Sequence, residues 1–279
     1  MTTHHQHDDN AHQHDDNAMA DLLDLDAEVF HDYLSEVLAL VQAAAPPQPR
    51  ILDLGSGSGT GSIALARHFP QSAVTAVDLS EDMLRHLRHR AAEAGLGDRV
   101  RTVQADLDAG WPALEPVDLA WASASMHHLA DPDRVLADLF ATIRPGGLLT
   151  VVELGSFPRF LPAGLAGFEE RAHAIADAAR HAQMPHIGSD WGPVLSKAGF
   201  TVEAERPFTV DLSDPLPAAT GRYARASLGR LRTGIGDRLD AADRATLDAL
   251  LADDGPESVL HRPDLNVRTE RTVWLARRP

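Results

Sequence analysis

Short apolar runs and amphipathic segments alternate along most of the chain. Apolar runs bounded by glycine, proline or polar residues predict strands, and apolar residues recurring every three or four positions predict helices. Strands are predicted at residues 51–54, 73–77, 100–105, 117–121, 148–153, 200–210 and 267–277. Helices are predicted at residues 62–69 and 191–198. A further helix is predicted to begin at Asp131-Pro132, with Asp131 as its N-cap, and to end at a turn formed by Arg144-Pro145-Gly146-Gly147. This order predicts an α/β protein with a largely parallel sheet.

The N-terminal part of the chain has a different pattern. Residues 20–45 carry apolar side chains at helical spacing, and Pro46-Pro47 ends the predicted helix. The segment His5-Gln6-His7-Asp8-Asp9-Asn10-Ala11 recurs unchanged at residues 12–18. A segment this polar cannot bury enough apolar area to offset its ordering entropy, so residues 1–18 are predicted to be a disordered tail. Weak capture of a divalent metal by its His and Asp residues is the alternative.

A glycine-rich loop follows the first predicted strand. The loop Gly55-Ser56-Gly57-Ser58-Gly59 joins that strand to a helix, so backbone N–H groups and a helix N-terminus can approach a ligand closely. Asp78 ends the second predicted strand about 20 residues later, where Rossmann-like folds hydrogen-bond a ribose. The third glycine comes one residue early for a dinucleotide fingerprint, and no lysine follows as a phosphate loop requires. A nucleoside-containing cofactor is predicted.

The string D-L-G-S-G-S-G at residues 53–59 resembles motif I of the class I S-adenosylmethionine (SAM) methyltransferases. Asp106 follows the third predicted strand, where that family places an acid or amide over the adenine amino group. Residues 117–153 resemble the small-molecule branch typified by the quinone-biosynthesis methyltransferases. The resemblance extends over residues 50–155, and it implies a seven-stranded Rossmann-like sheet of order 3-2-1-4-5-7-6 whose last strand is antiparallel.

The resemblance also implies that S-adenosyl-L-methionine is the cofactor, and it indicates which residues bind it. The expected cofactor-binding residues are Asp53, Gly55, Gly57, Gly59, Asp78, Leu79, Met83, Asp106, Leu107 and Ser123. The helix at residues 20–45 is expected to cover the cofactor, and its His31 and Tyr33 are candidates to face the acceptor. Residues 156–192 and 212–262 are predicted to be insertions that form a lid over an apolar acceptor pocket.

Methyl transfer from a sulfonium depends mainly on alignment of the reactants and exclusion of water. A general base is needed only when the acceptor atom carries a proton. His127, directly after the fourth predicted strand, is the candidate base, with His128 beside it as a structural residue and with His173, His181 and His186 of the lid as weaker candidates. The D/N-P-P-Y/F sequence used to methylate nucleobase and amide nitrogens is absent after that strand, which excludes that subclass. No zinc or iron ligand spacing is present, so no metal is predicted.

Charge and composition narrow the classes of partner. The net charge is −16, and residues 1–28 contribute eight acids and no Lys or Arg. The acidic remainder repels phosphate backbones, so a nucleic acid substrate is not expected. The chain has no Cys, no membrane-length apolar run and no secretory signal pattern, which predicts a cytoplasmic protein without membrane insertion.

These observations predict a SAM-dependent methyltransferase that acts on an O, N or C atom of a small, partly apolar metabolite. Homodimer formation is left open. A catalytically idle SAM-binding regulator remains an alternative, because motif I is common to both. A nicotinamide dehydrogenase is a third hypothesis, and SAM binding would separate it from the first two.

Overall fold

The computed structural model describes residues 17–279. Residues 1–16, which hold most of the tandem repeat, lie outside the described residues, so for them the prediction of a disordered tail stays a prediction. The last two residues of the predicted tail, Asn17 and Ala18, are helical instead. The strands form one seven-stranded sheet in the order β3-β2-β1-β4-β5-β7-β6. They are β1 Ile51–Leu54, β2 Val74–Asp78, β3 Val100–Gln104, β4 Val117–Ser123, β5 Ile143–Leu154, β6 Thr201–Leu212 and β7 Val267–Arg277.

The pairing of the strands confirms the predicted topology. β1 pairs in parallel with both β2 and β4, and β5 continues the parallel set beside β4. β7 runs antiparallel to β5 on one side and to β6 on the other. All four residues of β1 are buried, as expected for a central strand covered on both faces. The carboxyl ends of β1 to β5 therefore meet at one edge of the sheet, where ligands bind in open α/β folds.

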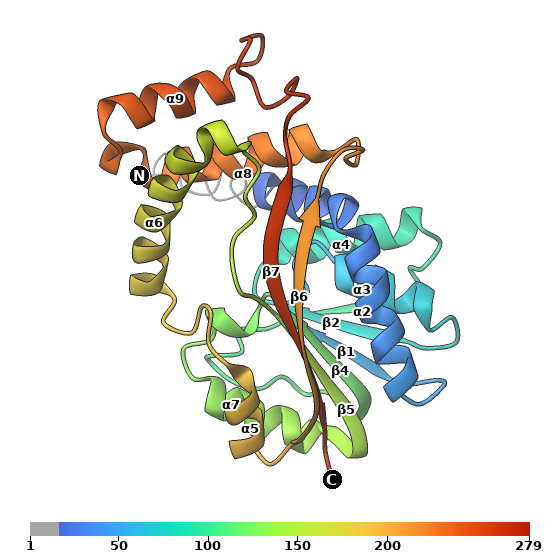
Figure 1. The fold of residues 1–279 in the computed structure, drawn as a ribbon. Coiled ribbons are helices and arrows are strands. Elements are labelled where there is room, and N and C mark those ends of the chain that lie inside the picture. The colour runs from blue at the N-terminus through green and yellow to red at the C-terminus, as the bar shows by residue number, and fades with distance from the viewer. Residues whose placement is uncertain (1–16) are drawn as a thin grey trace, which may run out of the picture.

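Helices cover both faces of this sheet (Figure 1). They are α2 His31–Ala44, α3 Thr60–His68, α4 Glu81–Glu93, α5 Pro132–Thr142, α6 Ala166–Gln183, α7 Trp191–Lys197, α8 Thr220–Ile235 and α9 Ala241–Leu251, with short 3-10 turns η1 Met126–His128, η2 Ala163–Leu165 and η3 Gly236–Arg238. Residues 17–29 form a further helix, here called the 17–29 helix. The helices α2, α3 and α4 bury one apolar cluster against the sheet, while α5 and α7 bury another on the opposite face.

The two predicted insertions supply the helices at one end of the sheet. Figure 1 shows α6, α8 and α9 grouped beyond the start of β7, at the carboxyl edge of the parallel strands. The first insertion holds η2 and α6, and the second holds α8, η3 and α9. The buried side chains of α6 and α8 belong to the same apolar cluster as α2, so the insertions pack as part of the domain core.

Several local signals act as predicted. Asp131 caps α5, since its carboxylate accepts a hydrogen bond from the Arg134 amide at 3.1 Å, and Pro132 occupies the first turn. The turn predicted at Arg144-Pro145-Gly146-Gly147 is instead the first part of β5, with Gly146 at φ +79° and a register shift against β4. The backbone pairs again with β4 from Leu148, which is where the predicted strand begins.

The predicted helix at residues 20–45 is wrong as a single element. It is two helices, the 17–29 helix and α2, with a break at Phe30. Residues on both sides of this break contact the Arg271 guanidinium, namely Asp26, Phe30 and Tyr33. No helix within residues 17–279 has the length and apolar character that crossing a membrane requires.

Candidate active site

A cavity of about 980 Å³ opens at the carboxyl edge of the sheet. Its wall includes the glycine loop after β1, the ends of β2 and β4 and the start of the chain after β3. The 17–29 helix, α2, α6 and α8 complete it. The cavity is therefore larger than a nucleoside alone needs and extends from the parallel strands into both insertions.

The glycine loop brings its backbone to the cavity because side chains would not fit there. Gly55 has φ +62°, and a Cβ atom at this position would lie 2.5 Å from the Cβ of Ser125. Gly55 and Gly57 both line the cavity, as predicted. Gly59 does not, because it faces α4, where a Cβ atom would overlap the Leu87 side chain. The prediction that Gly59 contacts the cofactor is therefore not supported, and glycine is required there by its φ of +87° and by packing against Leu87.

Asp78 ends β2 at the position predicted for ribose recognition. Its carboxylate accepts hydrogen bonds from the Gly57 amide at 2.8 Å and from the Ser80 amide at 2.9 Å. Asp78 is half-buried and lines the cavity. It thus shapes the glycine loop, and its carboxylate oxygens retain further lone pairs for a ligand hydroxyl.

Asp53, the acid of motif I, is buried at the base of the cavity. Burial raises the pKa of this carboxyl to about 7, the nearby Asp78 adds to the rise, and a hydrogen bond from the Ser62 hydroxyl opposes it. The Ser62 Oγ to Asp53 Oδ2 distance is 2.6 Å. The indole N–H of Trp121 lines the same region, is buried and has no hydrogen-bond partner. These groups offer a carboxylate acceptor and an unused donor to a polar ligand.

The other predicted cofactor residues border the same part of the cavity. They are Leu79, Met83, Asp106, Leu107 and Ser123. Leu79 is 64% exposed, the one large apolar side chain in residues 17–279 that is strongly exposed. Asp106 is exposed and accepts the Asp108 amide at 2.9 Å.

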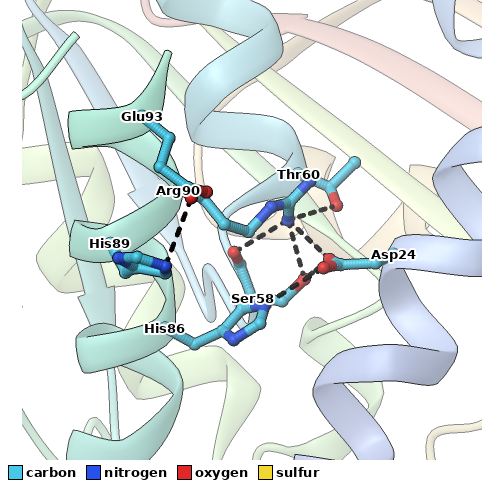
Figure 2. A network of polar contacts seen from close by, with 7 residues as sticks. All are labelled: Asp24, Ser58, Thr60, His86, His89, Arg90 and Glu93. Atoms are coloured by element: carbon cyan, nitrogen blue, oxygen red, sulfur yellow. Dashed lines mark hydrogen bonds and ion pairs between the residues drawn. The ribbon is translucent and has the colours of Figure 1, made fainter. Parts of the chain in front are cut away.

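The 17–29 helix is held over the glycine loop by a polar network (Figure 2). Asp24 of this helix accepts a hydrogen bond from the Ser58 hydroxyl at 2.9 Å and pairs with Arg90 of α4 at 2.6 Å. His86 of α4 lies 3.0 Å from the other Asp24 oxygen. Arg90 also donates to the Ser58 carbonyl at 3.0 Å, so it bridges the helix and the loop. We call Asp24, Ser58, His86 and Arg90 the Asp24 clamp.

His127 lies in η1, at the end of β4, where it is 4% exposed and lines the cavity. Its Nδ1 lies 2.6 Å from Oε2 of Glu153, the penultimate residue of β5, and the Met126 amide donates to Oε1 at 2.8 Å. A carboxylate at Nδ1 fixes the ring and leaves Nε2 free of that contact. The predicted structural role of His128 differs from the observation, because His128 is exposed while His127 is buried.

The remaining histidine candidates divide by location. His173 of α6 lines the cavity, and its pKa is lowered to about 3 by burial and by the positive charges of Arg159 and Arg180. His181 and His186 are not part of the cavity wall. His31 is exposed to solvent, whereas Tyr33 is buried and lines the cavity. A ring that resists protonation is a weak base, so His127 remains the better candidate.

The sequence interpretation missed Glu153, Trp121 and Arg271. Glu153 is an acid at the carboxyl end of a strand adjacent to β4, and that position alone could have identified it. Trp121 lies in a continuously buried run of β4 and Arg271 in the alternating part of β7. Neither pattern reports the direction in which a polar atom points.

The strand order, with its antiparallel β7, and a glycine loop facing an acid on β2 define a methyltransferase-type Rossmann-like fold. Residues 51–147 match the family described as "Methyltransferase domain". These residues therefore form a class I SAM-dependent methyltransferase domain, which confirms the resemblance predicted from the sequence.

Named relatives and solved structures agree with this class. The chain is 34% identical over 156 residues to malonyl-[acyl-carrier protein] O-methyltransferase of Laribacter hongkongensis, covering 54% of this chain and 50% of the relative. It is 39% identical over 101 residues to trans-aconitate 2-methyltransferase of Azoarcus sp., covering 36% of this chain and 37% of that relative. The chain thus spans half or less of the length of these relatives.

Among solved structures, a protein of Bacillus halodurans has TM-score 0.55 at 21% identity, covering 88% of this chain and 99% of that chain. The [4+2]-cyclase SpnF has TM-score 0.51 at 21% identity, covering 88% of this chain and 81% of that chain. At these identities the likeness concerns the fold. A cyclase among the neighbours shows that the fold alone does not fix the reaction.

Proposed function

We propose that the protein transfers a methyl group from S-adenosyl-L-methionine to an oxygen, nitrogen or carbon atom of a small, partly apolar metabolite. The main support for this proposal is one continuous cavity. It extends from the glycine loop and Asp78 to His127, which Glu153 holds, and to the two insertions. The curated relatives named above, which act on malonyl-[acyl-carrier protein] and trans-aconitate, support a non-nucleic-acid acceptor.

The residues present fit the cofactor. Gly55 and Gly57 bring bare backbone to the cavity wall, because a Cβ atom at Gly55 would overlap Ser125 and one at Gly57 would lie 3.1 Å from Leu23. Asp78 would receive the ribose hydroxyls, and Asp106, Leu79 and Met83 would border the adenine. The buried Asp53 and the unpartnered Trp121 N–H would meet the amino-acid tail. When bound, SAM supplies a methyl group on a cationic sulfonium, a good leaving group.

His127 is the residue proposed to handle a proton. Where the acceptor atom carries one, Nε2 would receive it while Glu153 holds the ring through Nδ1. Where the acceptor atom has a free lone pair, the same wall only orients the acceptor and excludes water. The insertions would supply the exclusion, since α6 and α8 close the cavity opposite the glycine loop.

Calorimetric titration with SAM and S-adenosylhomocysteine tests the cofactor assignment. We expect both to bind the wild-type protein and Asp78→Ala to weaken both, with exposed Asp98→Ala as the matched control. Absence of binding by the wild-type protein would refute the proposal, and binding of NADH in its place would support the dehydrogenase hypothesis.

A measurement of turnover distinguishes the methyltransferase hypothesis from that of a catalytically idle SAM-binding regulator. Release of S-adenosylhomocysteine is measured with a panel of small organic acids, phenols and amines as acceptors. Production of S-adenosylhomocysteine above the acceptor-free rate supports methyl transfer. Tight binding of cofactor without turnover on any acceptor would favour the regulator.

A further inference from the structure

The charged side chains of the cavity wall are segregated by sign. Asp53 lies in β1, Asp78 ends β2, and Asp106 and Asp108 follow β3, so the acids gather at one side of the sheet. The cations are all arginines, Arg180, Arg230, Arg238 and Arg271, and they come from α6, α8, η3 and β7. Because β7 and β3 lie far apart in the strand order, the cavity has an acidic half and a basic half.

This polarity contrasts with the charge of the whole chain. The net charge is −16, so four arginines gathered in one half of a cavity are not a consequence of average composition. Asp26 is the one acid of the wall that lies among them. Burial lowers the pKa of Arg180, and the positive charges of Arg159 and Arg230 lower it further although Asp177 opposes this. Among the cations of the wall, Arg180 and Arg230 are thus close enough to repel each other, which an anionic ligand would relieve.

Arg271 is the buried member of this group. It is 9% exposed, and its Nη2 donates to Asp26 Oδ1 at 2.6 Å. The same Asp26 oxygen accepts from the Tyr223 hydroxyl at 2.7 Å. A guanidinium has five N–H donors, and the Nε–H of Arg271 is buried without a partner. The ion pair with Asp26 therefore leaves hydrogen-bonding capacity unused.

Tyr33 supplies a second unused donor beside it. The Tyr33 ring lies 5.3 Å below the Arg271 guanidinium, and its hydroxyl is buried with no hydrogen-bond partner. Tyr33 is 8% exposed, and both residues line the cavity. Buried polar groups are normally satisfied, so two orphan donors on adjacent side chains point to a ligand that accepts from both.

The position of Arg271 relates this pair to the reaction centre. Arg271 of β7 is directly opposite Leu154 of β5, the residue after Glu153, which holds His127. Leu154 also lines the cavity. An acceptor held by Arg271 would therefore extend from there toward the His127 end of β4.

We propose that the acceptor is an organic anion whose carboxylate or phosphate group is bound by the Arg271 guanidinium and the Tyr33 hydroxyl. This inference rests on the proposed function, since it names the substrate class of the same site. The guanidinium matches either anion in a bidentate contact. Arg180, Arg230 and Arg238 add the surrounding positive charge, and the apolar wall accommodates the rest of the molecule.

The experiment uses the full chain saturated with S-adenosylhomocysteine and three series of probes. These are alkyl carboxylates, alkyl phosphates and neutral alkyl amides of four to ten carbons, titrated by calorimetry. We expect one anionic series to bind at least tenfold more tightly than the amide of equal length. The tighter series identifies the anion, and its affinity should fall as salt rises from 50 to 300 mM, while that of the amide should not. If no anion exceeds its amide, the inference is refuted.

Two variants with a control assign the residues. Arg271→Gln should abolish the preference for the anion over the amide. Tyr33→Phe should weaken binding of the anion about fivefold, which is the effect of losing one hydrogen bond, and should leave binding of the amide unchanged. Tyr33→Phe removes a hydroxyl that bonds nothing, so folding is preserved. Tyr223→Phe is the control, because its hydroxyl is already used by Asp26. Unchanged anion preference in both Tyr33→Phe and Arg271→Gln would overturn the assignment.

The outcomes also separate this inference from the function. S-adenosylhomocysteine affinity is measured on every variant. Failure of the wild-type protein to bind S-adenosylhomocysteine refutes the proposed function, whereas normal binding without anion preference refutes only the substrate class.

Discussion

Replacing Asp24 by asparagine should release the 17–29 helix from the glycine loop. The change preserves the side-chain shape and removes the charge that Arg90 and His86 contact at 2.6 and 3.0 Å. Hydrogen bonds to charged groups contribute about 1.5–3 kcal/mol each. Asp24, Arg90 and His86 are a quarter to a third exposed, and the amide oxygen of the substituted side chain would still accept from Ser58, so we take about 2 kcal/mol for the loss.

A loss of about 2 kcal/mol raises the population of the opened helix roughly 30-fold, since 1.4 kcal/mol corresponds to a factor of ten. Amide hydrogen exchange at residues 17–29 should accelerate by that factor, while exchange in β3 changes much less. SAM should also dissociate faster, because a Leu23 methyl group lies 3.1 Å from where a Cβ atom of Gly57 would be. The helix must move for the loop to be uncovered.

The control is Asp21→Asn, an exposed acid on the same helix with the same change of charge. It should leave both exchange and dissociation near the wild-type values. If Asp24→Asn gave exchange at residues 17–29 within threefold of the wild type and an unchanged dissociation rate, the Asp24 clamp would not hold the helix, and apolar contacts alone would do so.

Four further outcomes follow from the site. Asp78→Ala should weaken SAM binding at least ~50-fold by calorimetry, and unchanged affinity would remove Asp78 from the site. The same change should lower the free energy of unfolding of the apo protein by about 2 kcal/mol, because two backbone amides lose their acceptor. Asp106→Ala should cost about 1–2 kcal/mol of SAM binding and relax discrimination against an inosine-type analogue, which titration with both nucleosides checks. His127→Ala should lower kcat about 10²-fold or more with SAM affinity preserved, and wild-type turnover would show that positioning alone suffices. Because the pKa of Asp53 is raised to about 7, its carboxyl is neutral below that pH in the free protein. The affinity for cationic SAM should therefore rise between pH 6 and 8, and this rise should disappear in Asp53→Asn.

Local sequence signals predicted the sheet well, because glycine loops, caps and strand periods act over a few residues. β7 has the bounds that its alternation predicts, and Asp131 caps α5 as expected. The burial of His127 rather than His128 could not be predicted, since it depends on Glu153 reaching η1 from the neighbouring strand. The contacts of Arg271 could not be predicted either. Alternation within a strand indicates the face of the sheet on which a side chain lies, but it does not indicate which distant helix packs against that side chain.

The contacts of Asp26 bear on the order in which the protein acquires its site. Asp26 is 197 residues from Tyr223 and 245 residues from Arg271 along the chain. During synthesis the glycine loop and the first four strands can form early, while the acceptor end cannot close until β7 has been made and inserted between β5 and β6. Contacts of such long separation form late and slowly, so a nascent chain would have a place for cofactor before it has one for acceptor.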